Sequence, residues 1–490
     1  MNILMVAPES VPFVKVGGLA DAVGALAQAL SKKGHDVRIV IPKYHDLKHF
    51  ESAKLLEESS MQVQLGVEDV YSRVWENSYP DCSAKVYFLE YEMYFGSGDV
   101  YRGPSGIEEH NGYRFAFLSR GSLDLCNHLN WVPDIIHCHD WATGLIPAFL
   151  NTNDFNQPLG RAASIMTIHN LQHQGYSTPS VLSFAGLPNG LFKQDGYESY
   201  GQLNMLKGSI YHSTKISTVS PSYAKEIQTP EYGCGLDSVT RFRSPDLIGV
   251  INGIDTNEWN PSIDPLIIEN FSLKDLGGKS KCKKDLQSTC GLVEDENTPL
   301  FVVVSRLYDQ KGLDLLLQIS DRLMQETKIQ IALVGTGDEN LENAFVHLSK
   351  VYPKRFSALL KFDNILAHKT IAGGDFLLMP SRFEPCGLSQ MYAMRYGTIP
   401  IVRCTGGLRD SVQVCPEDWS KGCGFNFTNI DAIELLNVIM RASEIYTKEK
   451  QTFLSMQANG MKMDFSWTTS AQKYESLYGW AMDARKQAFI

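Results

Sequence analysis

A single carboxylate stands at a glycine turn in the segment SRFEPCGL, where Glu384 is followed by Pro, Cys and Gly. An apolar run with helical spacing comes next, and a second glycine turn follows at Thr405, Gly406 and Gly407. Backbone N–H groups at glycine turns that open a helix are suited to bind phosphate oxygens. Two interpretations of Glu384 stay open: a carboxylate that stabilises the helix N-terminus, or one that faces a sugar hydroxyl while neighbouring amides hold a phosphate.

Three cations stand beside comparable turns. Arg306 and Lys311 in SRLYDQKG follow an apolar run and precede a helix-like segment. They are either ordinary solvated charges or a guanidinium and an ammonium that together grip a diphosphate. Lys15 precedes Gly17 and Gly18 in KVGG, a pattern typical either of an anion site or of an ordinary turn. The segment matches neither GxGxxG nor GxxxxGK[ST], which disfavours dinucleotide and P-loop sites.

Other polar residues also end apolar runs: His169 and Asn170 in TIHN, and Asp140 in HCHD. A lone histidine at such a position is commonly structural. HCHD lacks a second pair of residues at zinc-ligand spacing, and the absence of GxSxG disfavours a serine nucleophile. No Asp-x-Asp pair occurs in the sequence. We therefore expect neither a metal nor another cofactor.

Strand-like and helix-like segments alternate along the chain and predict where these residues lie. MNILMVAP, a helix-like segment that ends at Gly34, and DVRIVIP form a βαβ pattern. Further apolar runs include PDIIHCHDW, AASIMTIHN and KISTVS, and the alternation restarts after GVINGID with PLFVVVSRL, IQIALVGTGD, DFLLMPS and GTIPIVRC. The pattern predicts two doubly wound parallel sheets, with the polar turns at the carboxyl ends of strands. Two such sheets that face each other would enclose a ligand cleft.

The composition describes an ordinary globular protein: 490 residues, 43% hydrophobic and 20% charged, with a formal net charge of -10. This balance, without a long run of Lys and Arg, disfavours nucleic acid and membrane surfaces as partners. The start MNILMVAPES lacks the features of a signal peptide, and no apolar stretch of about 18 residues is present. Ten scattered cysteines fit reduced thiols in the cytoplasm; a plastid stroma is the alternative for a mature plant or algal chain.

Eight stretches together resemble the bacterial glycogen synthase and plant starch synthase family. In chain order they are KVGGLADAVGAL, HCHDWATGL, TIHNLQHQG, TVSPSYAKEI, VINGIDTNEWNP, SRLYDQKGLDLL, LVGTGD and SRFEPCGLSQMYAMRYGTIPIVRCTGGLRDSV. The resemblance implies a GT-B fold of two Rossmann-like domains that face each other across a cleft. It also implies transfer of glucose from a nucleotide-glucose, with ADP-glucose favoured, to the non-reducing 4-hydroxyl of an α-1,4-glucan, with retention of the anomeric configuration.

Domain boundaries follow from the alternation together with this resemblance. We expect an N-terminal Rossmann-like domain over residues 1–248, the starch synthase catalytic domain, on the side of the glucan acceptor. Residues 249–466 are expected to form the domain on the side of the nucleotide-sugar donor. The aromatic tail, residues 467–490, has helical spacing and is expected to pack back on the first domain.

The resemblance further implies roles for residues at matching positions. Glu384 and His169 are expected beside the transferred glucose. Arg306 and Lys311 are expected to bind the diphosphate and stabilise the leaving group. The expected donor-binding residues are Lys15, Gly17, Gly18, Phe362, Cys386, Gly387, Leu388, Thr405, Gly406 and Gly407, and the expected acceptor or cleft residues are Asp21, Tyr101, Asp140, Asn170 and Asn252.

Two departures from the family pattern bear on the substrates. Phe362 stands where many members have a tyrosine that stacks on the base, so stacking is retained and a phenolic hydrogen bond is not. WATGL replaces the commoner WHAGL, which changes the acceptor side at Ala142 and Thr143.

No second acid is placed to act as a covalent nucleophile. We therefore expect the leaving group to depart and the acceptor to attack on one face of the sugar, within an ion pair that cations and amides stabilise. One alternative is a UDP-glucose-dependent GT-B enzyme with another acceptor. It is disfavoured because Tyr392 occupies the second acidic position of the E-x7-E motif of that group. Another is a catalytically silent glucan-binding protein, which the intact cations and Glu384 disfavour. The sequence does not decide between ADP and UDP or between glycogen and starch.

Overall fold

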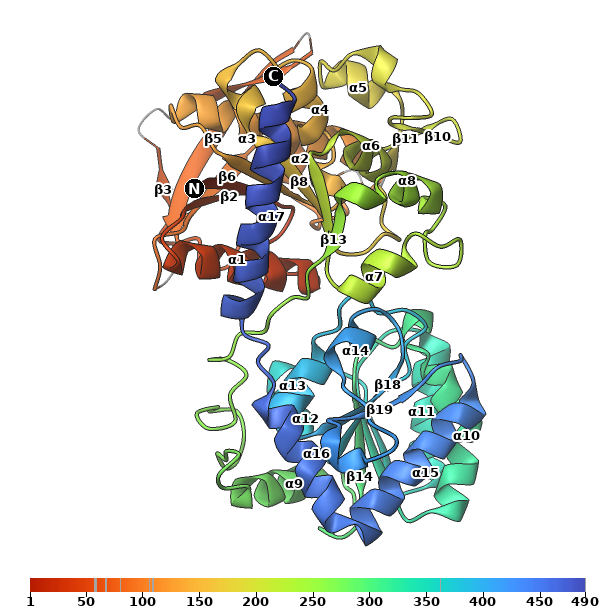
Figure 1. Cartoon of the computed structure of the whole chain (residues 1–490). Helices are drawn as coiled ribbons and strands as arrows, with labels where there is room; N and C mark the ends of the chain where they lie inside the picture. Colours follow the sequence, from red (N-terminus) through yellow and green to blue (C-terminus); the bar gives the residue numbers. More distant parts are fainter. Residues whose placement is uncertain are drawn as a thin grey trace. The chain divides into compact units, whose positions relative to one another are not determined.

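The computed structural model describes residues 1–56, 60–66, 68–79, 81–104, 106–107, 110–361 and 363–489. The chain divides into two compact units (Figure 1). The first consists of Met1–Gly253 together with Trp467–Ile490, and the second of Ile254–Ser466. Among the described residues, no helix combines the length and the apolar character needed to cross a membrane.

A ten-stranded sheet forms the centre of the first unit, in the order β13-β12-β8-β7-β1-β2-β6-β5-β3, with β4 paired to β5. The strands from β13 to β6 are parallel neighbours, whereas β5 runs antiparallel to β6. The strands are β1 (Asn2–Val6), β2 (Asp36–Pro42), β3 (Lys54–Leu55), β4 (Met61–Leu65), β5 (Glu68–Ser78), β6 (Lys85–Glu90), β7 (Ile135–His139), β8 (Ala163–Ile168), β12 (Lys215–Thr218) and β13 (Leu247–Gly249). A small separate sheet contains β9 (Tyr176–Ser177), β10 (Glu198–Ser199) and β11 (Gln202–Asn204).

The helices of the first unit are α1 (Gly18–Lys32), α2 (Glu92–Phe95), α3 (Asn111–His128), α4 (Ile146–Asn151), α5 (Ser180–Phe184), α6 (Met205–His212), α7 (Pro221–Glu226), α8 (Asp237–Phe242) and α17 (Trp467–Gln487). The C-terminal helix α17 lies beside α1 in this unit (Figure 1). Its side chains Trp467, Tyr474 and Tyr478 share a buried core with β1, β7 and β8. Arg485 fixes the other end of the helix, because its guanidinium donates to the carbonyl oxygens of Leu150 and Gly160.

The second unit contains a fully parallel six-stranded sheet in the order β16-β15-β14-β17-β18-β19. The strands are β14 (Leu300–Val304), β15 (Gln330–Val334), β16 (Phe356–Leu359), β17 (Phe376–Met379), β18 (Ile399–Arg403) and β19 (Phe425–Phe427). The helices are α9 (Gly277–Thr289), α10 (Leu313–Glu326), α11 (Glu339–Val351), α12 (Asn364–Gly373), α13 (Ser389–Arg395), α14 (Gly406–Ser411), α15 (Ala432–Lys448) and α16 (Lys450–Lys462).

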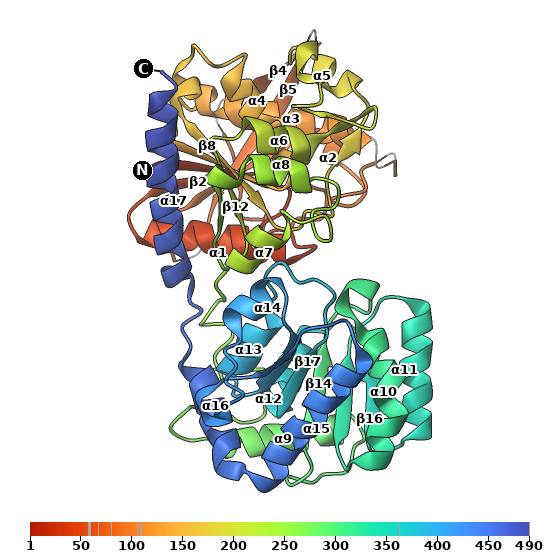
Figure 2. The same cartoon turned by 45° about the vertical axis from the view of Figure 1, so that its right-hand side comes forward.

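Helices cover both faces of this second sheet, with α10, α11 and α15 on one face and α9, α12 and α13 on the other (Figure 2). Burial on both faces explains why a strand such as β14, LFVVV, is apolar along its length instead of alternating. The side chains of Phe301 and Val303 point into one core, and those of Leu300 and Val302 into the other.

The strand order reverses at one place in each sheet. In the second unit the reversal lies between β14 and β17, and in the first unit it lies between β1 and β7. This is the order of the doubly wound Rossmann fold, whose ligands bind at the carboxyl ends of the strands at the reversal. The predicted α/β class with two doubly wound parallel sheets is confirmed.

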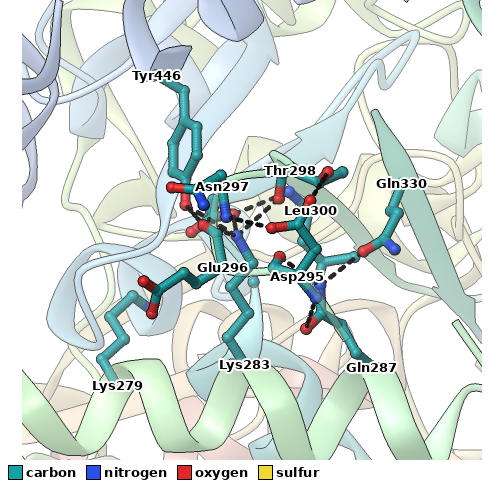
Figure 3. A network of polar contacts seen from close by, with 12 residues as sticks. Lys279, Lys283, Gln287, Asp295, Glu296, Asn297, Thr298, Leu300, Gln330 and Tyr446 are labelled. Atoms are coloured by element: carbon teal, nitrogen blue, oxygen red, sulfur yellow. Dashed lines mark hydrogen bonds and ion pairs between the residues drawn. The ribbon is translucent and has the colours of Figure 1, made fainter. Parts of the chain in front are cut away.

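The buried Lys283 on α9 fastens the segment before β14 to the amino-terminal end of β17 (Figure 3). Lys283 Nζ lies 2.7 Å from Asp375 Oδ2 and donates to the carbonyl oxygen of Thr298 at 2.7 Å and to the Tyr446 hydroxyl at 2.8 Å. Lys279, one turn earlier, donates to the carbonyl oxygen of Ala372 and to the hydroxyl group of Thr398. Burial lowers the pKa of Lys279 to about 8.

Lys283→Met should lower the free energy of unfolding of the second unit by about 3–5 kcal/mol, because it leaves the buried Asp375 carboxylate without its cation. Urea denaturation of the full chain measures this effect. Lys284→Met, on the exposed face of the same helix, is the control and should change stability by less than about 0.5 kcal/mol. Equal urea midpoints for the two variants would contradict the structural role of the buried pair.

Candidate functional site

The loops after β14 and β17 bring Lys311 and Glu384 together at the strand reversal of the second unit. Lys311 Nζ lies 2.6 Å from Glu384 Oε2, and Ser381 Oγ donates to the same oxygen at 3.0 Å. Two donors therefore fix one carboxylate oxygen. Oε1 of Glu384 has no partner in the part of the chain that the structure describes, so it is the oxygen left for a ligand hydroxyl.

A second set of bonds clamps the same two loops. Arg382 donates to both oxygens of Asp314 at 2.6 and 2.8 Å, a bidentate pair. The backbone N–H of Arg382 donates to the carbonyl oxygen of Gln310 at 2.8 Å, and the Gln310 amide donates to the carbonyl oxygen of Phe383 at 3.2 Å. Sequence reasoning missed this clamp, although Arg382 lies within the segment SRFEPCGL, two positions before Glu384.

The turn at Cys386, Gly387 and Leu388 adopts a fixed local geometry. Gly387 has a φ of 71°, in the left-handed region that favours glycine. The Gln390 amide donates to the carbonyl oxygens of Cys386 at 3.1 Å and Gly387 at 3.0 Å. Leu388 then directly precedes α13. Gln390, itself fully buried, was not predicted as part of the site.

The turn at Thr405, Gly406 and Gly407 packs directly against the Glu384 loop. A Cβ at Gly406 would lie 2.0 Å from the carbonyl oxygen of Glu384, and one at Gly407 would lie 2.1 Å from that of Cys386. The two glycines are therefore required for close approach. The Gly407 N–H donates to the Glu384 carbonyl oxygen at 3.0 Å, so this amide ties the two loops together.

A pocket of about 240 Å³ opens beside these loops within the second unit, and its lining includes Arg306, Lys311 and Ser381. Arg306 is exposed, with its guanidinium 5.7 Å from the centre of the Tyr308 ring. No carboxylate pairs with Arg306 among the described residues. The pocket thus has an unneutralised cation on its wall, which suits an anionic ligand.

Phe362, predicted to stack on a base, lies outside the described residues. Its neighbours Lys361 and Asp363 line the same pocket, together with Gly335 at the end of β15.

In the first unit, Asp140 and His169 follow neighbouring strands β7 and β8. Asp140 Oδ1 accepts the backbone N–H of His169 at 2.7 Å, and the φ of Asp140 is 57°, a strained value for a non-glycine residue. Burial raises the pKa of Asp140 to about 8 and lowers the pKa of His169 to about 3. Asn170 holds its own turn, with its Oδ1 accepting from the N–H of Gln172 at 3.0 Å.

The KVGG loop is organised by an acid that sequence reasoning missed. Glu9 Oε2 accepts the backbone N–H groups of Val16 and of Gly17, and Glu9 Oε1 accepts the Tyr101 hydroxyl at 3.0 Å. Burial raises the pKa of Glu9. The Gly17 amide is thus bonded to Glu9, which differs from the expected bond to a donor phosphate. The acid in APES, just after the first strand, was the signal that could have found it.

The surface around Lys15 and Gly17 is accessible to solvent. Lys15 Nζ pairs with Asp21 Oδ1 at 2.8 Å, and the Lys15 side chain is 52% exposed. A Cβ at Gly17 would meet nothing within 4 Å, and the φ of -145° there suits any residue. Neither packing nor backbone strain therefore requires a glycine at position 17. Its lack of a side chain leaves free space beside Lys15. Gly18 begins α1.

Asn252 lies at the end of the first unit's main segment and is 5% exposed. Its Oδ1 is buried and has no hydrogen-bond partner among the described residues. No bond among those residues joins it to the other predicted site residues.

The comparisons with known proteins agree with this arrangement. The family model described as starch synthase catalytic domain matches residues 2–242, and the one described as glycosyl transferases group 1 matches residues 291–450. Glycogen synthase 1 of Geobacter sulfurreducens is 43% identical over 99% of this chain and 97% of its own length. The chain belongs to the glycogen and starch synthase family.

Other members of the glycogen and starch synthase family are similarly close. Glycogen synthase of Thermotoga maritima is 44% identical, with 98% of both chains covered. The catalytic domain of starch synthase IV from Arabidopsis thaliana, solved with ADP and acarbose, is 34% identical with a TM-score of 0.89, over 98% of this chain and 99% of that one. The resemblance drawn from the motifs is confirmed, as are the GT-B fold class and the enzyme class. The chain is a glucosyltransferase that elongates a glucan from a nucleotide-sugar donor.

Proposed function

We propose that this glucosyltransferase uses ADP-glucose and adds its glucose, with retention, to the non-reducing 4-hydroxyl of an α-1,4-glucan. The observation that carries the proposal is the Lys311–Glu384 pair beside a pocket that Arg306 lines. The site combines cations for a diphosphate with a carboxylate oxygen for a sugar hydroxyl. The ADP bound in the related starch synthase IV structure supports adenine as the base.

In this proposal the second unit binds the donor. Arg306 and Lys311 bind the diphosphate oxygens and neutralise charge that grows as the glycosidic bond breaks. Glu384 Oε1 accepts a hydroxyl of the transferred glucose. The turns at Cys386–Leu388 and Thr405–Gly407 shape the walls of the donor site, and Phe362 stacks on the base.

We also propose substrate-binding roles for residues of the first unit. Lys15 supplies a further cation for the donor phosphates, next to the space left at Gly17. His169 lies beside the transferred glucose, with Asp140 holding its backbone. The remaining acceptor-side assignments, also proposals, are Asp21, Tyr101, Asn170 and Asn252.

Retention follows from departure and attack on the same face of the sugar. Glu384 is the acid assigned to the glucose, and one of its oxygens is already bonded to Lys311 and Ser381. A carboxylate held in this way is better suited to orient the sugar and stabilise positive charge than to form a covalent bond. We propose the cytoplasm as the location, because all ten cysteines are free thiols.

The decisive experiment compares ADP-glucose with UDP-glucose at equal concentrations, with glycogen as the acceptor. We expect a higher kcat/KM for ADP-glucose, and a product that β-amylase digests from its non-reducing ends. A higher kcat/KM for UDP-glucose would overturn the assignment of the donor. Failure of both donors to elongate glycogen would overturn the proposed function as a whole.

Activity should be independent of divalent metal ions. Arg306, Lys311 and Lys15 supply positive charge where other nucleotide-sugar transferases use a metal held by an Asp-x-Asp pair, and this sequence contains no such pair. The rate with ADP-glucose and glycogen in excess EDTA should stay within about twofold of the untreated rate. Loss of activity in EDTA with recovery in Mg²⁺ or Mn²⁺ would contradict the assignment of the phosphate charge to these cations.

A further inference from the structure

Two histidine rings meet at the carboxyl ends of β7 and β8 in the first unit, the buried His139 and the partly exposed His169. His139 Nδ1 and His169 Nε2 are 3.0 Å apart, so one proton lies between them. The other nitrogen of His139, Nε2, is buried and has no hydrogen-bond partner among the described residues. Nδ1 of His169 is bonded to no other described residue and is not among the buried unpaired atoms, so it is open to a ligand.

The neighbouring ring of His137 cannot supply the missing hydrogen-bond partner for Nε2 of His139. The His137 ring packs against that of His139 at a tilt of 33°, with 4.1 Å between ring centres. Both of its nitrogens are already engaged, Nδ1 with the Tyr478 hydroxyl at 2.9 Å and Nε2 with Thr167 Oγ1 at 2.6 Å. His137 therefore holds the His139 ring in place without offering it an acceptor.

The position of the shared proton follows from these contacts. If His169 donated it, the proton of neutral His139 would lie on Nε2, a buried N–H without an acceptor. If His139 donates it, Nε2 carries only an unused lone pair. Buried N–H groups without partners are rarer than unused acceptors, so the second arrangement is favoured. Burial lowers the pKa values of both rings, which keeps them neutral near pH 7.

We propose that His139 is a positioning residue whose Nδ1–H donates to His169 Nε2, which leaves His169 Nδ1–H as a donor toward the transferred glucose. The assignment of that hydrogen bond to glucose rests on the proposed function. Adjacent residues at the end of β7 then fix His169 in two ways: Asp140 accepts its backbone N–H at 2.7 Å, and His139 sets the orientation and tautomer of its ring.

Two substitutions of His139 separate this role from simple packing. His139→Asn keeps an N–H near the place of Nδ1, whereas His139→Leu fills similar volume without a donor. We expect His139→Leu to lower kcat about 10²-fold, as misplaced or wrongly tautomeric groups do, with KM for ADP-glucose changed by less than about threefold. The kcat of His139→Asn should be at least about tenfold higher than the kcat of His139→Leu. Equal kcat values for the two variants, whether high or low, would overturn the proposal.

The tautomer itself can be read without any activity measurement. The full-length wild-type protein, labelled with ¹⁵N in its histidines and free of substrate, gives a two-bond ¹H–¹⁵N spectrum in which the protonated nitrogen of each ring is distinguishable. The His169 signals are those that disappear in His169→Gln. We expect the proton on Nδ1 of His169, and a proton on Nε2 would overturn the proposal. A wild-type protein that transfers no glucose would instead refute the proposed function and leave the tautomer result intact.

Discussion

Glu384→Ala is expected to lower kcat by about 10²–10³-fold with little change in melting temperature, as loss of a preorganised electrostatic group does. The reason is the asymmetry of the carboxylate. Lys311 and Ser381 hold Oε2 at 2.6 and 3.0 Å, so Oε1 is fixed in space before any ligand arrives. Removing the side chain removes that oxygen and releases Lys311. Steady-state kinetics with ADP-glucose and glycogen measure the effect.

Two further variants make the Glu384 result specific. Glu384→Gln keeps the shape of the side chain and removes its charge, so it should retain substrate affinity better than kcat. Glu339→Ala, at an exposed position in the first turn of α11, should leave kcat unchanged. A Glu384→Ala enzyme with near-wild-type kcat would show that the carboxylate does not act on the sugar.

Lys311→Ala should lower kcat about 10²–10³-fold as well, because its charge acts on the diphosphate most strongly when the glycosidic bond is breaking. Arg306→Ala should act in the same direction. In both variants kcat and kcat/KM should fall together, the pattern of an interaction made mainly in the transition state. Lys350→Ala, exposed on α11, is the matched control. A rise in KM at constant kcat would show that these cations bind only the ground state.

The contact between Lys311 and Glu384 predicts strong non-additivity. In the double variant, Lys311→Ala with Glu384→Ala, the loss of kcat should be far smaller than the product of the two single losses, because each side chain orients the other at 2.6 Å. A multiplicative loss would show that the two groups act independently despite their contact.

The position of the site in each sheet was largely predictable from sequence. Apolar strands that end in polar turns identified SRLYDQKG, SRFEPCGL, HCHDW and TIHN, because parallel strands place such turns at one edge of a sheet. The reversal of strand order then brings β14 next to β17. Lys311 and Glu384 therefore become neighbours although they are 73 positions apart in the sequence.

The hydrogen bonds inside the site were not predictable in the same way. Sequence reasoning treated the backbone amides of the KVGG and CTGG turns as donors for phosphate. In the structure, Glu9 accepts the Gly17 N–H and the Glu384 carbonyl oxygen accepts the Gly407 N–H. Whether a turn's N–H faces outward depends on how two loops pack, and a single sequence carries no record of that contact. The tautomer that we propose for His169 could not be predicted either, because it depends on a contact with His139, which lies on another strand.

The first unit is discontinuous, and this has a consequence for how the protein is made. Its sheet is complete at Gly253, yet α17, which supplies Tyr478 to His137, comes from the last part of the chain. At ~5–20 residues per second, synthesis of the intervening unit takes roughly 10–40 s. During this interval the groove that later holds Trp467, Tyr474 and Tyr478 is open on the nascent chain. The interior of the first unit, down to the His137 ring that packs against His139, can therefore be completed only after the intervening unit has been synthesised.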